Sequence, residues 1–134
     1  MFSFATSFNS SIDSWDTSNV TSMDYMFTFA TSFNQPINAW DTSNVTTMEA
    51  MFNSAKAFNQ PLNDWDTSNV TTMKSMFDGA KDFDQDLSNW TIQSSCNVNS
   101  MFSGCGLQCE NYCKMKAAWG SIMTGYNDKS CTCN

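Results

Sequence analysis

Apolar and polar positions along the chain follow a pattern that returns every 25 residues. Met-Phe pairs mark its register, without any insertion, at Met1-Phe2, Met26-Phe27, Met51-Phe52, Met76-Phe77 and Met101-Phe102. Columns of Ala, Phe and Trp recur at the same spacing. A fixed period of roughly 20 to 50 residues is typical of solenoids and arrays, in which each unit leaves an apolar face that only its neighbour covers. The sequence therefore predicts a stack of like units that cannot fold singly.

One unit of the repeat predicts a short strand, a turn and a short helix. In residues 48–58 the apolar positions fall at helical spacing, and the Asn-Gln-Pro at 59–61 stops a helix there. Leu62, Trp65 and Thr67 are the inward candidates of a short strand, and the following Asp-Thr-Ser-Asn supplies turn chemistry. The four Trp of this column are predicted to be core residues.

The repeat resembles a known family of surface repeats. The resemblance rests on Leu62-x-x-Trp65-x-Thr67, then Ser68-Asn69-Val70-Thr71-x-Met73, then Met76-Phe77-x-x-Ala80-x-x-Phe83. This order resembles the BspA-like leucine-rich repeats of bacterial and protist surface proteins, and most closely the 25-residue surface repeat of mycoplasma lipoproteins. The resemblance covers residues 1 to about 107. It implies an α/β repeat, a right-handed leucine-rich-repeat-like solenoid on a secreted or surface-anchored protein linked with adhesion, and it brings no catalytic residues.

The last quarter of the chain departs from the repeat. We expect a solenoid of four to five repeats over residues 1–108 and a stapled C-terminal cap over 109–134, because repeat arrays need a terminal unit that covers the last exposed core. All the cysteines lie in this part, at Cys96, Cys105, Cys109, Cys113, Cys131 and Cys133. Their even number favours three disulfides and an oxidising compartment, with fifteen pairings open. The alternative is a zinc site, since three of them have one-turn spacing, but the chain has no His.

A column of aspartates, Asp16, Asp41 and Asp66, raises the question of a metal. Like charges stacked at about 5 Å repel one another. The first interpretation is that each carboxylate accepts backbone N–H groups in an Asx-type turn. The alternative is a Ca²⁺ ion held by neighbouring carboxylates with help from Asp64 or Asp13, although calcium usually gathers six to eight oxygens. No other cofactor is expected.

Two threonine columns suggest an ice-binding surface as a minor alternative. The column of Thr17, Thr42 and Thr67 is predicted to point inward, because Ile92 takes its place in the fourth unit. The column of Thr21, Thr46 and Thr71 is the exposed candidate, and a single file of Thr is a weak signal.

Five sequons fit the N-glycosylation pattern. Three of them, at Asn19, Asn44 and Asn69, belong to the repeat consensus, where Asn more often forms an inward hydrogen-bonding ladder. The sequons at Asn9 and Asn89 lie outside that phrase and are the better acceptors.

Charge and composition exclude several classes of function. The net charge of -7, with six Lys and no Arg, argues against a nucleic-acid partner or an anionic membrane. No apolar run is long enough to span a bilayer, and the amino terminus has no signal-peptide pattern, so a leader has been removed or the chain is a fragment. The lack of His, of a Gly-rich phosphate loop and of a nucleophile elbow argues against an enzyme.

These observations predict a secreted or cell-surface scaffold that presents repeated faces to a protein or glycan partner. A structural subunit that polymerises end to end into an extracellular filament is the alternative. It rests on the first unit, where Phe2, Phe4 and Phe8 have no earlier repeat to pack against, so that copies of the chain would be the partner.

Overall fold

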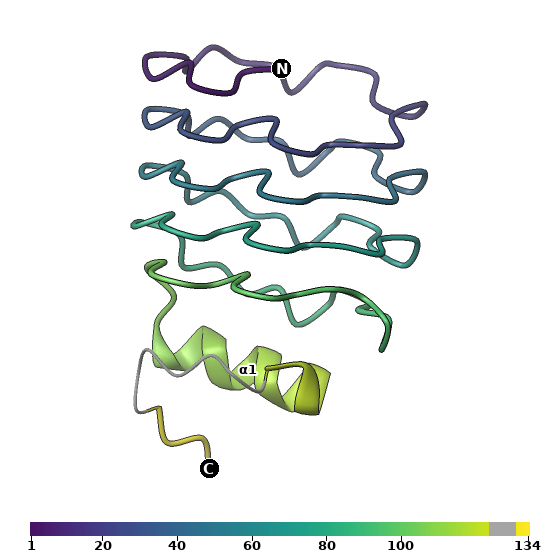
Figure 1. The fold of residues 1–134 in the computed structure, drawn as a ribbon, viewed down its shortest axis with the longest axis vertical. Helices are drawn as coiled ribbons and strands as arrows, with labels where there is room; N and C mark the ends of the chain where they lie inside the picture. Colours follow the sequence, from purple (N-terminus) through teal and green to yellow (C-terminus); the bar gives the residue numbers. More distant parts are fainter. Residues whose placement is uncertain (124–130) are drawn as a thin grey trace.

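The chain winds into flat coils that stack on one another. The computed structural model describes residues 1–123 and 131–134. The predicted cap over 109–134 includes residues 124–130, which lie outside the described part. We number the coils by the Met-Phe pairs: residues 1–25 are coil 1, 26–50 coil 2, 51–75 coil 3 and 76–100 coil 4, and residue 101 begins a fifth. Successive coils lie directly over each other, with the amino terminus in the coil farthest from the helix (Figure 1).

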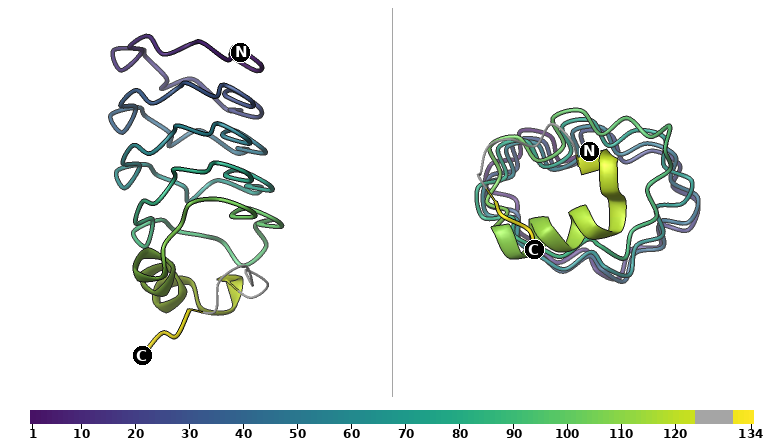
Figure 2. Two further views of the ribbon diagram at one scale, coloured as in Figure 1. Left: turned by 90° about the vertical axis from the view of Figure 1, so that its left-hand side faces the viewer. Right: turned by 90° about the horizontal axis from the view of Figure 1, so that it is seen from below.

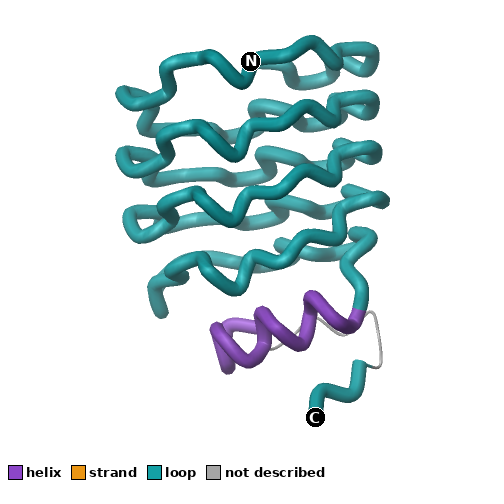
Figure 3. Tube along the Cα trace, turned by 180° about the vertical axis from the view of Figure 1, so that it is seen from behind, coloured by secondary structure: helices purple, strands orange, loops and turns teal. Residues whose placement is uncertain are grey.

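Regular helix is confined to the carboxyl end. Helix α1 (Cys109–Trp119) continues into the short 3-10 helix η1 (Gly120–Met123). Both lie across the open end of the last coil when the stack is viewed along its length (Figure 2). Helix α1 ends at Gly120, whose φ of 55° is readily adopted by glycine and whose N–H bonds the Lys116 carbonyl. Elsewhere in the described chain the backbone is drawn as turns and loops (Figure 3).

The predicted α/β leucine-rich-repeat-like solenoid is wrong. The repeats contain neither helix nor sheet within the described residues, and the pairing between coils that resembles a strand is reduced to the parallel bridges Ser22–Thr47, Thr47–Thr72 and Thr72–Asn97. The expected helix over 48–58 is a run of turns instead. The apolar spacing correctly predicts that one side of residues 48–58 is buried, but the backbone of this segment is a run of turns and not a helix.

The direction of the backbone N–H groups explains this correction. Every second N–H in the expected helix points to the next coil, at 2.7 to 3.0 Å, from Met48, Ala50, Phe52 and Ser54 to the carbonyls of Thr72, Lys74, Met76 and Asp78. Between them, the N–H groups of Met51 and Asn53 close turns to the carbonyls of Met48 and Ala50, three residues back, and the N–H of Glu49 donates to the Asp24 carboxylate. An α-helix would need all of these N–H groups for bonds four residues back. Every second backbone N–H group therefore joins neighbouring coils instead of forming an internal hydrogen bond of a helix.

Left-handed residues make these successive turns. Positive φ recurs in two columns of the repeat, at Phe4, Phe29, Ser54, Gly79 and Gly104, and at Tyr25, Ala50, Ser75 and Ser100. Glycine carries no penalty for this conformation, whereas a bulky side chain does. At Gly79 a Cβ atom would also lie 3.1 Å from the hydroxyl of Ser54 in the coil before.

Columns of parallel aromatic rings fill the inside of the stack. Phe52 lies between Phe27 and Phe77, with ring centroids 5.5 Å apart on both sides, and it is fully buried. A second phenylalanine of the same coil, Phe58, packs against it at 4.0 Å. Ring stacking of this kind adds to the free energy of burial. Each ring needs a coil above and a coil below, which is why single units cannot fold.

The Trp column is buried, as predicted, except at Trp15 of coil 1, and each buried Trp ties its coil to the one before. Trp40, Trp65 and Trp90 are each 3% exposed. Their indole N–H groups donate to the carbonyls of Ile12, Ile37 and Leu62, at 2.8 to 3.0 Å. The inward direction of Thr17, Thr42 and Thr67 is also confirmed, because all three are buried.

Helix α1 closes the stack and makes the same kinds of hydrogen bond to the coil before it as a further coil would. Its buried residues are Tyr112, Met115 and Trp119. The Trp119 ring stacks on Phe102 of coil 5, and its indole N–H donates to the Trp90 carbonyl of coil 4 at 3.1 Å. The Asp84 carboxylate accepts the backbone N–H of Gln108 at 2.8 Å and the side-chain amide of Asn111 at 3.1 Å. In the coils before, an Asn side chain accepts the same kind of pair from the next coil.

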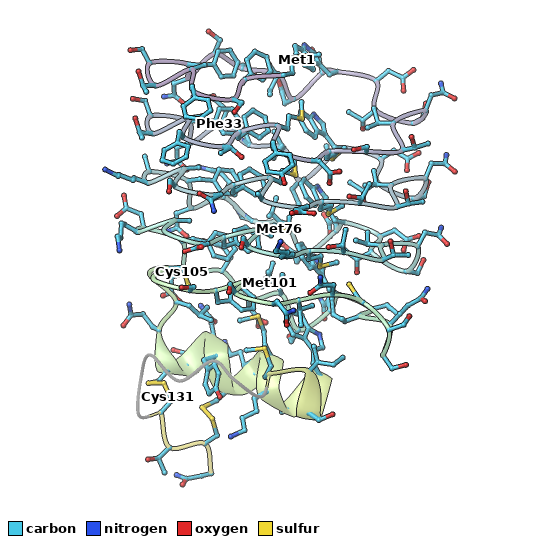
Figure 4. All side chains as sticks on the ribbon, viewed as in Figure 1. Met1, Phe33, Met76, Met101, Cys105 and Cys131 are labelled. Atoms are coloured by element: carbon cyan, nitrogen blue, oxygen red, sulfur yellow. A yellow bond between two sulfur atoms is a disulfide. The ribbon has the colours of Figure 1, made fainter. Side chains whose placement is uncertain are left out.

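Two disulfides fasten the chain end to this helix, where three were predicted. Cys109 bonds Cys131 and Cys113 bonds Cys133, so one face of α1 carries both bridges, seen as yellow bonds near Cys131 in Figure 4. Cys96 and Cys105 keep their thiols, so the third bridge is wrong. These two cysteines occupy repeat columns held elsewhere by Thr and Ala, on different parts of the coil. The zinc alternative also fails, because two of its three ligands are bridged.

We expect Trp65→Ala to lower the free energy of unfolding by about 3 to 5 kcal/mol, as large truncations in a core do. The matched control is Trp15→Ala in coil 1, whose side chain is 40% exposed and which should cost clearly less. Urea unfolding followed by fluorescence measures both. Equal costs for the two variants would contradict this account of the core.

Mass spectrometry after alkylation should find two bridges and two thiols per chain. Burial raises the pKa of the Cys96 thiol, so we expect it to react slowly in the native protein and quickly in urea. Reduction should lower the melting temperature, because the loss of a native bridge typically costs about 2 to 5 kcal/mol. Three bridges, or an unchanged melting temperature, would be the contrary result.

Candidate functional site

The repeated Asp-Thr-Ser-Asn phrase forms the same turn in three coils. In coil 2, one oxygen of the Asp41 carboxylate accepts the Ser43 backbone N–H at 3.0 Å and the Ser43 hydroxyl at 2.6 Å. Asp16 and Asp66 make the equivalent bonds to Ser18 and Ser68. The predicted Asx-type turn is confirmed.

Hydrogen bonding keeps these carboxylates charged. The Ser hydroxyl and then the Ser N–H hold the pKa of Asp16, Asp41 and Asp66 below the ordinary value of a carboxyl. The charges of Asp16 and Asp66 act in the opposite direction on the pKa of Asp41, and the hydrogen bonds outweigh them. The column therefore carries a line of negative charges at neutral pH, each offset by local donors.

Hydrogen bonds between coils fix the position of each turn. The Asn44 and Asn69 amides donate to the carbonyls of Ser18 and Ser43, both at 2.8 Å. The Thr46 hydroxyl donates to the carbonyl of Thr21 one coil earlier, at 3.1 Å. These groups are exposed and yet tied to the neighbouring coil, so the surface is rigid.

We call this surface the Asp-Asn-Thr face. Its members are exposed and recur in coils 1 to 3: Asp16, Asp41, Asp66, Asn19, Asn44, Asn69, Thr21, Thr46 and Thr71. The sequence predicted the Asn of this phrase as an inward ladder. The ladder exists between coils, but the side chains lie at the surface.

A second asparagine ladder, which the sequence analysis missed, lies half-buried in another part of the coil. The Asn34 side-chain oxygen accepts the backbone N–H of Asn59 at 3.0 Å and the side-chain amide of Gln60 at 3.1 Å. Asn9 and Asn59 repeat this arrangement in the coils on either side. The signal was the Phe-Asn-Gln phrase, in which Gln follows Asn in two consecutive units.

The five sequons differ in how their side chains are used. The Asn9 side-chain oxygen belongs to the second asparagine ladder, and the Asn44 and Asn69 amides are bonded to carbonyls. All five Asn are exposed. Glycosylation at any of them stays a prediction.

A calcium site at the Asp column finds no support in the geometry. Within residues 1–123 and 131–134, no group of three or more acidic or Cys side chains is placed to hold a metal ion. One oxygen of each column carboxylate is already bonded twice within its own turn. The turn alone accounts for the repeated Asp.

The described part of the chain has no helix long and apolar enough to cross a bilayer. Its two disulfides are typical of proteins that fold in oxidising compartments.

The chain belongs to a family described as "Mycoplasma protein of unknown function, DUF285", whose model matches residues 1–115. The match covers the repeats and the first part of α1. It agrees with the resemblance to a mycoplasma-type surface repeat and gives no support to the leucine-rich part of that resemblance. No curated protein and no solved structure matches the chain.

Replacing Ser43 with Ala should raise the pKa of Asp41 toward the ordinary carboxyl value, because the hydroxyl donor is lost. Since the folded state has the lower pKa, the turn's contribution to stability is present above the unfolded pKa of 3.8 and is lost as the pH falls through the folded value. Titration of the carboxyl by NMR measures the shift. The control is Ser14→Ala, an exposed serine of coil 1, which should leave the pKa of Asp41 unchanged.

Proposed function

We propose that this protein is a secreted or cell-surface recognition scaffold that binds a protein or glycan through the Asp-Asn-Thr face. The observation that carries the proposal is the repetition of one exposed set of polar groups in three consecutive coils. The Asp turn is hydrogen-bonded in all three coils, and the Asn and Thr side chains are bonded to the coil before in coils 2 and 3. A rigid surface loses little conformational entropy on binding, which favours affinity.

The regular spacing suits a partner that is itself extended or repeated. Several weak contacts of one kind add up when they are engaged together, and their effective concentration is high because the coils are fixed. The face offers carboxylates as acceptors and Asn and Thr side chains next to them, which suits sugar hydroxyls or the basic and amide groups of a protein.

The proposed role is binding without catalysis. Hydrolytic pairs of carboxylates need unlike surroundings to separate their pKa values, and a column of like turns gives them like ones. The exposed Thr hydroxyls of coils 2 and 3 already donate to backbone carbonyls, so we do not extend the proposal to ice binding.

The described residues argue against the filament alternative. A head-to-tail contact needs an open last coil, and helix α1 covers that coil through Trp119 and is held by two disulfides. We therefore carry forward the recognition scaffold alone.

The test is binding of the labelled chain to a printed glycan array and to cultured cells, with and without protease treatment of the cells. We expect saturable binding to one of the two, and the protease arm separates surface proteins from glycans. Substituting Asn for Asp16, Asp41 and Asp66 together keeps a turn-forming acceptor and removes three charges. Binding should then weaken roughly tenfold or more, because hydrogen bonds to charged groups contribute about 1.5 to 3 kcal/mol each.

The matched control replaces three other exposed acids, Asp13, Asp64 and Asp82, by Asn, with the same change in net charge. This variant should bind like the wild type. An equal loss in both variants would mean that only net charge matters, and the absence of saturable binding to array and cells would overturn the proposal.

A further inference from the structure

One sequon of coil 4, Asn89-Trp90-Thr91, stands outside the repeated phrase and lies in a tight turn. The Trp90 backbone N–H closes this turn by donating to the carbonyl of Leu87 at 2.9 Å, and the same turn occurs in each coil before. Its third position is exposed in all four coils and is held by Ser14, Ala39, Asp64 and Asn89. Since four unlike side chains occupy this position of one turn, the turn does not depend on the side chain of Asn89.

The three residues of this sequon alternate between solvent and core. Asn89 and Thr91 are exposed, whereas Trp90 between them is 3% exposed. The Trp90 indole N–H donates to the carbonyl of Leu62 at 2.8 Å, and its ring stacks on that of Trp65 at 6.2 Å. The buried indole therefore holds the turn in place and leaves both polar side chains in solvent.

Neither of these polar side chains is used by the fold. Within the described part of the chain, the side chain of Asn89 and the hydroxyl of Thr91 have no hydrogen-bond partner. Thr91 contributes its backbone carbonyl alone, which accepts the Thr67 hydroxyl at 3.0 Å. An N-linked glycan is bulky and hydrophilic, so an exposed turn with a free Asn amide is the kind of place that accommodates one.

The sequons of coils 2 and 3 differ in this respect. In coil 2 the amide nitrogen of Asn44 lies 2.8 Å from the Ser18 carbonyl oxygen, and the Thr46 hydroxyl donates to another carbonyl of coil 1 at 3.1 Å. Asn69 and Thr71 make the same two bonds in coil 3. A sugar on either amide nitrogen would crowd the carbonyl of the coil before. The other two sequons lie in coil 1, and we do not extend the comparison to them.

We propose that Asn89 is a site of N-linked glycosylation in the folded protein, and that Asn44 and Asn69 are not. The co-reactant is an oligosaccharide carried on a lipid pyrophosphate. The Asn89 amide nitrogen attacks C1 of the first sugar, so that a C–N bond forms and the bond from C1 to the pyrophosphate oxygen breaks. The lipid pyrophosphate leaves with the electron pair, and the amide gives one proton to a base of the transferase. Nothing is oxidised or reduced.

The glycan would mark the end of the Asp-Asn-Thr face. In coil 4 Thr91 takes the position of the column aspartates, and Asn89 stands two residues before it. A bulky group at this point would restrict a partner to coils 1 to 3, where the face is complete. The inference does not rest on the proposed function, because the glycan is measured without a binding partner.

The test is a peptide map of the full chain, expressed with a cleavable secretion leader in cells that glycosylate secreted proteins. Mass spectrometry before and after N-glycosidase treatment, which converts a glycosylated Asn to Asp, locates the glycan. We expect it at Asn89, with Asn44 and Asn69 unmodified. The chain is mapped from cells and from medium, so that poor secretion does not hide the result. An unmodified Asn89 in both samples, or a glycan at Asn44 or Asn69 in the secreted chain, would overturn the inference.

Thr91→Ala and Thr91→Ser are a matched pair of variants. Both keep Asn89 and the backbone carbonyl that Thr67 uses, but only Ser preserves the hydroxyl of the sequon. We expect the glycan to be lost from the first variant and kept in the second. A glycan that persists in Thr91→Ala would contradict the assignment.

The stability of the chain made without glycosylation supplies a second readout. Asn89→Ala should leave the melting temperature unchanged, because no bond of the fold is lost. Asn69→Ala should lower it, because the bond to the Ser43 carbonyl is lost. Equal losses in the two variants would mean that the Asn89 amide belongs to the fold, and this result would also overturn the inference.

Discussion

The fold depends on the pairing of each coil with the coil 25 residues further along the chain. Backbone N–H groups, Asn and Gln amides, indole N–H groups and parallel rings all cross the same boundary between coils. Within one coil there is little to hold the chain except turns, several of which contain left-handed residues that cost free energy. The cost of shaping a coil is met only when a second coil lies against it, and this makes the whole stack cooperative.

The same constraint determines what kind of surface the protein can present. A side chain that helps to join two coils has to recur in each of them, so the polar groups at the surface form columns of like residues. Asp41 and its Ser43 donors illustrate the result, because the carboxylate is shaped by its own turn and the turn is placed by Asn44. Such columns suit recognition of something extended. They do not bring unlike groups together, which is what most active sites require.

The sequence predicted which positions recur from coil to coil and which of them point inward, but it did not predict the backbone conformation. The period, the inward Trp and Thr67, and the Asx turn at Asp66 follow from residue types and spacing alone. The helix over 48–58 was wrong because an apolar residue every three or four positions fits both a helix and a run of turns with one buried side. What decides between them is whether the N–H of Phe52 finds its acceptor in its own coil or in the next one, and no local pattern carries that information. Gly79 and Gly104 are consistent with left-handed turns, but Phe rarely adopts a positive φ. Phe4 and Phe29 in the same column therefore argued against such turns. The third disulfide was predicted from the even number of Cys, but an even number does not require that all of them pair. Cys96 and Cys105 stand in columns held elsewhere by Thr and Ala, on different parts of the coil.

Helix α1 contacts the stack through groups of the last coils alone, chiefly the Trp90 carbonyl and the Asp84 carboxylate. The boundaries between coils 1 and 2, 2 and 3, and 3 and 4 share the same backbone bonds, the Asn ladder and the stacked rings. Removing or adding 25 residues in register would therefore leave the contacts of α1 with the last coils unchanged. It would create no new kind of contact between coils. The number of coils can therefore vary without a change of architecture. Identical stretches such as 40–48 and 65–73 offer places for recombination that change the number of coils one at a time, while each product still ends in the same cap.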